Sequence, residues 1–327
     1  MHSNVGPLTG GMSSRVEPVT EYLEEGYWEY GRFFGSWKRG KYLFPIDSEE
    51  SDRLDIFHKF FLEARGRLFS APIVKMPSKI MDLGTGTGIW PIDVADLYIT
   101  AEVMAVDLNR IQPALLRIPE NLVLKQFDIE ERAWTSLLTG CDLIHMRMLL
   151  GSIQTDLWPQ IYGNVFEHLI PGHGYIEQVE IDWIPRREGN SKPEYSSFPE
   201  WSERFLSSMD KLNRSARVAP ENIQWLMRTA GFTDIKQKII PVSLSPWSSV
   251  PHERSVARWF NAVLSRSLES LSMLPLIKKQ GDTREEVHEL CDKVKREICV
   301  LSNHGYCNIY VWTARKPAGS FSDVQDG

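Results

Sequence analysis

Apolar runs and helical spacings alternate through the middle of the chain. The run "SKIMDL" is followed by glycines at alternate positions, Gly84, Gly86 and Gly88, and "GIWPIDVADLY" then places apolar residues at helical spacing. Pro91 falls in the first turn of this helix, where its missing N–H costs no intrahelical hydrogen bond. The next run, "AEVMAVDL", has the pattern of a strand with Asp107 at its carboxyl end. This order predicts a β-α-β unit with parallel strands.

Further apolar runs extend this unit into a larger sheet. They predict strands over 121–129, 141–147 and 173–182, a later strand in "TDIKQKIIPVSL" and a last one in "YCNIYVWTARKP". Helices are expected between them, over roughly 156–168, in "FPEWSERFLSSMDKLN" with Pro199 in its first turn, and in "ENIQWLMRTAGF", which ends at Gly231. This alternation indicates an α/β fold.

The last two predicted strands flank an insertion with a helical pattern, over about 245–304. One helical face is shared by Val256, Trp259, Phe260, Val263 and Leu264. Thr283 and Glu286 form a capping box for a second helix. The inward face of that helix carries Val287, Leu290, Cys291, Val294 and Ile298. We expect both helices to cover the edge of the sheet or a pocket, with their cysteines in the core.

Composition narrows the class of protein. A chain of 327 residues with 42% hydrophobic content can bury a large core, either as one elaborated domain or as a domain plus accessory helices. The net charge of −6 and the lack of any run of five basic residues disfavour direct nucleic-acid binding. The four cysteines form no C-x-x-C pair, which suggests a reduced, intracellular protein. No uninterrupted apolar stretch approaches the length of a membrane span.

The glycine loop indicates a nucleoside ligand. Glycines let such a ligand approach the backbone closely, and Asp107 can accept hydrogen bonds from ribose hydroxyls. Gly84 and Asp107 lie about as far apart as the roughly 20 positions of the dinucleotide fingerprint. However, Ile89 stands where that fingerprint needs its third glycine, so the loop is G-x-G-x-G. With Asp82 before it, the segment resembles the S-adenosylmethionine site of class I methyltransferases; the alternative is an ordinary tight β-α turn.

Residues 22–44 hold nine aromatic side chains and precede a helix begun by Asp47, with Glu50 three residues later. One interpretation is a lid over the cofactor, because aromatic faces attract a sulfonium cation by about 0.5–2 kcal/mol per contact. The candidates for that contact are Tyr30, Phe33, Tyr42 and Phe44. The other interpretation is a twisted hairpin with cross-strand aromatic pairs. In domain terms, we expect a lid segment over 22–75, a methyltransferase domain over 76–317, and disordered ends over 1–21 and 318–327.

Several longer strings together point to one family. "RGKYLFPIDSEESDRLDIFHKFF", "DLGTGTGIW", "LNRIQP", "DLIHMRMLLGS", "YIEQVEID" and "LSPW…HERSVARWFN" resemble, in this order, the LaeA family of fungal methyltransferase-like regulators. The resemblance runs from about residue 28 to 317. Two positions depart from it: Tyr30 replaces the asparagine of an "NGR" segment, and Thr85 stands where a loop cysteine is common.

The resemblance implies a fold, a cofactor and a biological setting. The fold is the seven-stranded class I methyltransferase sheet with strand order 3-2-1-4-5-7-6, and the cofactor is S-adenosylmethionine. Members are nuclear, join velvet-domain proteins and control secondary metabolism and development. For this chain we therefore expect velvet-domain partners and a location in the nucleus, with the cytoplasm as a further compartment. The expected cofactor-binding residues are Asp82, Gly84, Thr85, Gly86, Gly88, Asp107, Leu108, Asp128, Ile129, Tyr30 and Tyr42.

Methyl transfer from a sulfonium mainly requires alignment, which can supply about 7–11 kcal/mol. A general base would help an oxygen or nitrogen acceptor, and the candidates are His58, His145, Glu180 and Asp182. The resemblance also implies self-methylation on a methionine, at Met148 in "DLIHMRM". If the strand continues that far, Met146 and Met148 share a face. Two alternatives remain open: a methyltransferase acting on the O, N or C atom of a secondary metabolite, and a cofactor-binding pseudo-enzyme that serves as an interaction module.

Overall fold

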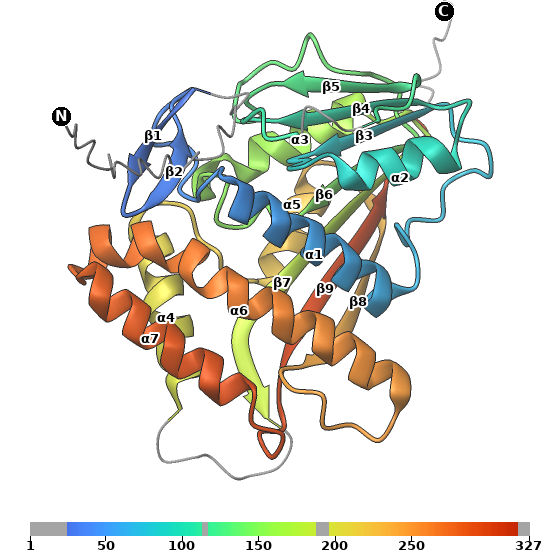
Figure 1. The fold of residues 1–327 in the computed structure, drawn as a ribbon. Coiled ribbons are helices and arrows are strands. Elements are labelled where there is room, and N and C mark those ends of the chain that lie inside the picture. Colours follow the sequence, from blue (N-terminus) through green and yellow to red (C-terminus); the bar gives the residue numbers. More distant parts are fainter. Residues whose placement is uncertain (1–24, 113–116, 188–195, 320–327) are drawn as a thin grey trace, which may run out of the picture.

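The structure, a computed structural model, describes residues 25–112, 117–187 and 196–319. Its centre is a seven-stranded sheet (Figure 1). The strands are β3 (Lys79–Leu83), β4 (Glu102–Asp107), β5 (Leu122–Gln126), β6 (Leu143–Arg147), β7 (Tyr175–Arg187), β8 (Thr233–Ser243) and β9 (Gly305–Arg315). The disorder predicted for 1–21 and for 320–327 falls outside the described residues.

The sheet has the order β5-β4-β3-β6-β7-β9-β8. The pairs from β5 to β7 are parallel, and β9 runs antiparallel to both of its neighbours. Counted in chain order from β3, this is the order 3-2-1-4-5-7-6. The predicted α/β fold of the class I methyltransferase type is therefore confirmed.

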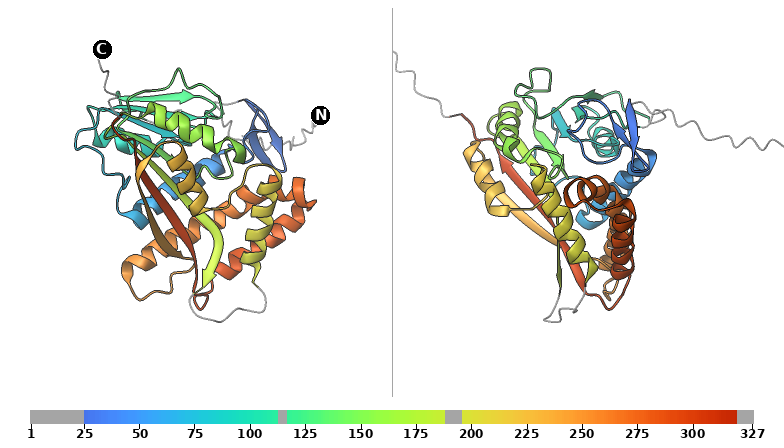
Figure 2. Two further views of the ribbon diagram at one scale, coloured as in Figure 1. Left: turned by 180° about the vertical axis from the view of Figure 1, so that it is seen from behind. Right: turned by 90° about the vertical axis from the view of Figure 1, so that its left-hand side faces the viewer.

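Seven α-helices cover this sheet within the described part of the chain (Figure 2). They are α1 (Ser48–Arg65), α2 (Ile89–Leu97), α3 (Trp158–His168), α4 (Ser197–Lys211), α5 (Pro220–Thr229), α6 (Pro251–Gln280) and α7 (Arg284–Ile298). Helices α3 and α5 pack with one face of the sheet, and α2 packs with the opposite face. The long strands β7–β9 extend past the rest of the sheet, and there they share a core with α1, α4, α6 and α7. None of these helices is long and apolar enough to span a membrane.

The predicted helical insertion corresponds to α6 and α7. The Thr283 hydroxyl accepts from the Glu286 N–H, and the Thr283 N–H donates to the Glu286 carboxylate, so the capping box is confirmed. Cys291 is buried as expected, but Cys299 is exposed because it lies just past the end of α7. The inward position predicted for Trp259 is also wrong: its side chain is 38% exposed, at the edge of the apolar face of α6.

The N-terminal segment begins with a two-stranded hairpin of β1 (Gly26–Glu29) and β2 (Arg32–Gly35). Tyr27 stacks on Phe34 and Trp28 lies against Phe33, with ring centroids 5.9 and 5.5 Å apart. For these rings the hairpin interpretation is therefore the correct one. Tyr30 occupies the turn with φ of 53°.

Asp47 joins this hairpin to α1. As the N-cap it accepts from the Glu50 N–H at 3.0 Å, as the sequence predicts. The same carboxylate receives two bonds of 2.7 Å from Arg32 and one of 3.2 Å from the Phe33 N–H. One buried acid thus fixes the direction in which α1 leaves the hairpin.

The end of α1 is tied to the centre of the sheet by a buried ion pair. Arg65 donates to Glu177 on β7, and both side chains are almost fully buried. Glu177 also accepts from the backbone N–H groups of Ser70 and Ala71, at 2.5 and 2.8 Å. The chain leaving α1 is therefore anchored on β7 before it enters β3.

Arg65→Met should destabilise the fold, because Glu177 would keep its charge in a buried site with backbone partners alone. We expect the free energy of unfolding, measured by urea denaturation at pH 7, to fall by about 3–5 kcal/mol. The matched control is Arg217→Met, whose exposed pairs with Glu203 and Asp210 should contribute less than about 1 kcal/mol. Equal losses in the two variants would contradict the role of this ion pair.

Candidate functional site

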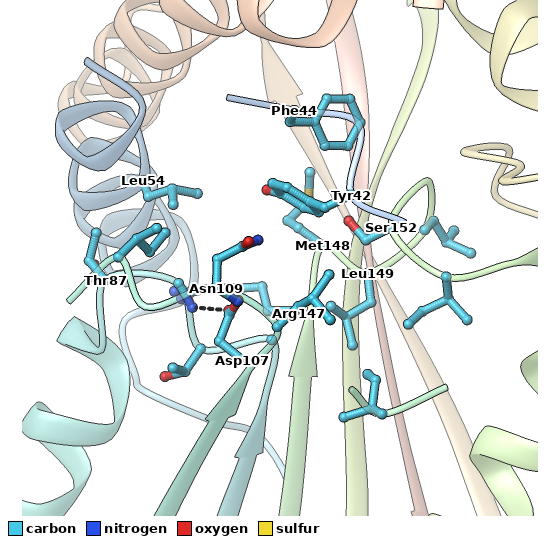
Figure 3. A pocket seen from close by; sticks show the side chains of 18 of the residues that line it. Tyr42, Phe44, Leu54, Thr87, Asp107, Asn109, Arg147, Met148, Leu149 and Ser152 are labelled. Atoms are coloured by element: carbon cyan, nitrogen blue, oxygen red, sulfur yellow. Dashed lines mark hydrogen bonds between the residues drawn. The ribbon is translucent and has the colours of Figure 1, made fainter. Parts of the chain in front are cut away.

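A cavity of about 150 Å³ opens at the carboxyl ends of β3, β4 and β6 (Figure 3). The crevice outside these strand ends is where open α/β sheets bind ligands. Its walls come from the glycine loop, the segments after β4, β5 and β6, helix α1 and the loop before it, with single residues from β7, α4 and α6. One side of the cavity, formed by the glycine loop and Asp107, is polar, and the opposite side is aromatic.

The glycine loop forms the floor of the polar side. Gly84 and Gly86 have φ of 71° and 59°, in the left-handed region that favours glycine. A Cβ on Gly84 would lie 2.3 Å from Leu149 Cδ2, and one on Gly86 would lie 3.2 Å from Leu54 Cδ1. Thr85 also lines the cavity, and its buried hydroxyl oxygen has no hydrogen-bond partner among the described residues. Gly88 does not line the cavity: it is the N-cap of α2.

Asp107 connects the glycine loop to the next segment. Its carboxylate accepts from the Gly86 N–H at 2.7 Å and from the Asn109 N–H at 2.9 Å, and it lines the cavity beside Leu108. Burial raises the pKa of Asp107 to about 6, although the two backbone N–H groups oppose that shift. The remaining lone pairs of this carboxylate suit the two hydroxyls of a ribose.

Asp128 and Ile129 line the cavity where the sequence places them, but Asp128 is already engaged. Lys38 and Lys41 donate to its carboxylate at 2.9 and 2.5 Å. Burial alone would raise the pKa of Asp128, yet these two ammonium groups hold it below its ordinary value. Asp128 therefore ties the segment that precedes α1 to the cavity wall, and its role in cofactor binding stays a prediction.

Met148 lies in the wall between the two sides of the cavity. Strand β6 ends at Arg147, and Met148 has a φ of 58°, which is rare for a residue with a side chain. Its N–H donates to Val179 O at 2.9 Å. Met146 instead packs in the core with α3, and the condition for the two methionines to share a face, a strand that continues to Met148, is not met.

Glu180 holds the turn that follows Met148. Its carboxyl group accepts from the N–H groups of Leu149 and Leu150, at 3.1 and 3.3 Å, and from Gln178. Burial raises the pKa of Glu180 to about 7. The side chain does not line the cavity, so the structure gives it a positioning role and not the predicted role of general base.

His145 and Asp82 pair with each other behind the glycine loop. The two residues are register partners on adjacent strands, and His145 Nδ1 lies 2.7 Å from Asp82 Oδ1. The imidazole stacks on Trp90 with centroids 3.9 Å apart. Burial lowers the pKa of His145, although Asp82 opposes the shift. Neither residue lines the cavity, which argues against His145 as a base and against Asp82 as a direct cofactor contact.

His58 and Asp182 are likewise outside the cavity wall. Asp182 pairs with Arg186 at 2.6 Å. His58 Nε2 lies 2.9 Å from Asp93 Oδ2, and Nδ1 lies 3.5 Å from an Arg147 nitrogen. Burial and the nearby Arg147 charge lower the pKa of His58 to about 4, so the imidazole is neutral at physiological pH. Among the described residues, no predicted general base reaches the cavity.

The second side of the cavity is aromatic. It is formed by Tyr42, Phe44, Phe57, Phe61, Trp183 and Phe205. Tyr42 meets Phe44 edge to face, with centroids 5.5 Å apart, and in Figure 3 Phe44 lies above Met148 while the Tyr42 ring overlaps the Met148 side chain. Tyr42 and Phe44 are thus where the lid interpretation places them, whereas Tyr30 and Phe33 belong to the hairpin and do not line the cavity.

Two arginines in the cavity wall were not foreseen. Arg53 donates to Glu50 at 2.8 Å and to Ser267 at 3.2 Å. Arg147 lies over the Phe61 ring at 5.0 Å and makes no ion pair with a carboxylate of the described residues. Burial lowers the pKa of Arg147 to about 10, which leaves the group charged. In the sequence, the only indication that Arg147 belongs to the site is its position at the end of a predicted strand.

Comparison with known proteins gives consistent results. The methyltransferase-domain family model matches residues 55–237. The chain is 60% identical to the secondary metabolism regulator laeA of Fusarium oxysporum f. sp. lycopersici, covering 92% of this chain and 95% of that protein. It is 51% identical to the regulator LAE1 of Hypocrea atroviridis, covering 92% and 86%. A solved structure of Haemonchus contortus phosphoethanolamine N-methyltransferase 2 with S-adenosyl-L-methionine is 17% identical, with a TM-score of 0.43, covering 81% and 52%.

The pH dependence of cofactor binding should report on Asp107. Ribose hydroxyls stabilise the ionised carboxylate, so binding below pH 6 must release a proton, and calorimetric affinity for S-adenosylhomocysteine should fall there. Above pH 6 the affinity should be constant. Asp107→Asn should weaken binding at pH 7.5 by about 1–3 kcal/mol and remove this pH dependence. The assignment would be contradicted if Asp107→Asn kept the same pH dependence of binding as the unmodified chain, or if the chain bound NAD in place of S-adenosylhomocysteine.

Proposed function

This chain belongs to the family of laeA and LAE1 secondary metabolism regulators and carries a methyltransferase domain, and we propose that it is a regulatory methyltransferase that modifies itself on Met148. Its cofactor is S-adenosylmethionine. The residues that hold the cofactor are those of the polar side of the cavity. Gly84 and Gly86 would admit it against the backbone, and Asp107 would bind its ribose.

The observation that carries the proposal is the placement of Met148. A left-handed backbone conformation costs on the order of 1–3 kcal/mol for a residue other than glycine, and such strain is typical of functional sites. Here it is combined with the hydrogen bonds that fix the neighbouring turn on Glu180 and Val179. The strained conformation places a thioether in the wall between the glycine loop and the aromatic side.

Methyl transfer to a thioether needs no general base, which fits the finding that none of the predicted bases, His58, His145, Glu180 and Asp182, lines the cavity. The Met148 sulfur attacks the methyl carbon with a lone pair, a new S–C bond forms, and the bond from that carbon to the cofactor sulfur breaks. No proton moves, and the positive charge passes from the cofactor to Met148. The aromatic rings of Tyr42 and Phe44 would stabilise the resulting sulfonium by about 0.5–2 kcal/mol per contact. S-adenosylhomocysteine leaves as a neutral thioether.

A second function, methyl transfer to a small metabolite, is favoured by the size of the aromatic side. Trp183 on β7 and Phe205 on α4 line the cavity from elements far from the glycine loop. A flexible methionine side chain does not need walls of this extent, whereas a flat apolar acceptor does. A third function, an interaction module that only binds cofactor, requires no acceptor at all.

We further propose that the chain acts in the nucleus, with the cytoplasm as a second compartment, as a subunit that binds velvet-domain proteins. This rests on resemblance to the LaeA family and on the regulatory role in the names of the relatives. Direct contact with nucleic acid is not part of the proposal, because the net charge is −6.

Incubation of the purified chain with methyl-labelled S-adenosylmethionine tests the acceptor. Peptide mass spectrometry should find the label on Met148, and Met148→Leu should abolish labelling while calorimetric binding of S-adenosylhomocysteine persists. Met146→Leu is the matched control, since that side chain is buried in the core and should leave labelling unchanged. An unlabelled chain that methylates a supplied aromatic metabolite would identify the second function instead.

A pull-down with a purified velvet-domain protein tests the regulatory assembly. We expect a stable complex at micromolar concentrations both with and without S-adenosylhomocysteine, as befits a subunit. Failure to form the complex in either condition would contradict this part of the proposal. A complex that forms only with the cofactor would instead favour the interaction module.

A further inference from the structure

We propose that Arg147 is a carboxylate receptor inside the cavity, an inference that rests on the proposed cofactor-dependent function. Arg147 is the last residue of β6 and directly precedes Met148. Both Arg147 and Met148 line the cavity. A ligand that fills the cavity therefore lies beside both residues.

The buried arginines among the described residues show why Arg147, which is partly buried, stands apart. Arg53 pairs with Glu50, Arg65 with Glu177 and Arg214 with Glu130. Pairing is the rule for buried charges, since removing a charge from water is costly without a counter-charge. Arg147, in contrast, has no carboxylate of the described residues within ion-pair distance.

The neighbours of Arg147 hold it in a fixed orientation. Phe61 covers one face of the guanidinium at 5.0 Å, which leaves the N–H groups at its edge available. One nitrogen faces His58 Nδ1, and the opposite ring nitrogen of His58 binds Asp93. Because His58 Nε2–H donates to Asp93, Nδ1 carries no proton and can accept from the Arg147 guanidinium. The neutral imidazole thus orients Arg147 without adding charge. A planar carboxylate fits the remaining edge of such a fork.

The charges around the cavity define what the ligand must carry. Among the described residues that line it, Lys41, Arg53, Asp128 and Glu130 are all ion-paired with protein groups. Asp107 is satisfied by backbone N–H groups alone, and Arg147 has no anion. Among these lining residues, Asp107 is therefore the one carboxylate and Arg147 the one cation without an ion-pair partner. A ligand with hydroxyl donors at one end and a carboxylate at the other would complement both.

Two ligands can supply that carboxylate: the amino-acid end of the cofactor, or an acidic methyl acceptor. Calorimetry with S-adenosylhomocysteine and with 5′-methylthioadenosine, which lacks the amino-acid end, separates them. If the cofactor is the source, the intact chain should bind S-adenosylhomocysteine about 10- to 100-fold more tightly than 5′-methylthioadenosine. Arg147→Met should remove that preference and leave 5′-methylthioadenosine affinity unchanged, which also shows that the variant is folded.

Two further variants sharpen the result. Arg147→Lys keeps the charge but loses the planar fork, so it should restore part of the preference. Arg217→Met, the same chemical change at an exposed pair on α4 and the following loop, should leave it intact.

The second arm tests an acidic acceptor, with benzoate as the probe and benzamide as its uncharged control. If the carboxylate comes from the acceptor, Arg147→Met should bind S-adenosylhomocysteine normally. Its cofactor complex should then lose benzoate binding about 10- to 100-fold relative to the unmodified chain. The inference is overturned if Arg147→Met changes neither the affinity for S-adenosylhomocysteine nor the affinity of the cofactor complex for benzoate. An unmodified chain that binds neither nucleoside would overturn the proposed function and this inference with it.

Discussion

Helix α1 buries ionisable side chains, and the geometry of the site depends on how each is neutralised. Glu50 and Arg53 pair with each other and reach serines of α6, His58 lies between Asp93 and Arg147, and Arg65 binds Glu177 on β7. A buried charge without a partner costs several kcal/mol. The helix is therefore held at three places along its length, by the insertion, by the cofactor domain and by the centre of the sheet. Its aromatic residues then form a fixed wall of the cavity.

The two sides of the cavity arise from different parts of the chain. The polar side is local, because the glycine loop and Asp107 belong to one β-α-β unit and bond to each other directly. The aromatic side is assembled from α1, the segment before it, β7 and α4. Met148 and Arg147 stand where these sides meet. A methyl group presented by the polar side would thus face an acceptor held by elements that can vary independently of the cofactor site.

This division explains what could be predicted from the sequence. The sheet, Asp47 as a cap and the glycine loop with Asp107 depend on neighbouring residues, so their patterns are readable. The roles of Asp128 and His145 depend on distant partners. Lys38, which lies 90 positions earlier in the sequence, forms an ion pair with Asp128. His145 lies beside Asp82 because the two residues are opposite each other on adjacent strands. A polar residue in an apolar strand has the same pattern whether it faces a ligand or a buried partner. The end of the strand at Arg147 was predicted, but the left-handed conformation of Met148 was not, because no glycine stands at that position.

Hydrogen–deuterium exchange with and without S-adenosylhomocysteine tests the central claim most directly, namely that the cofactor binds on the polar side of this cavity with its methyl group toward the aromatic side. The account predicts slower exchange in three separate segments: the glycine loop, residues 107–112, and residues 41–61 before and within α1. Slower exchange in the glycine loop alone would contradict it, since the N-terminal segment would then be no part of the binding site.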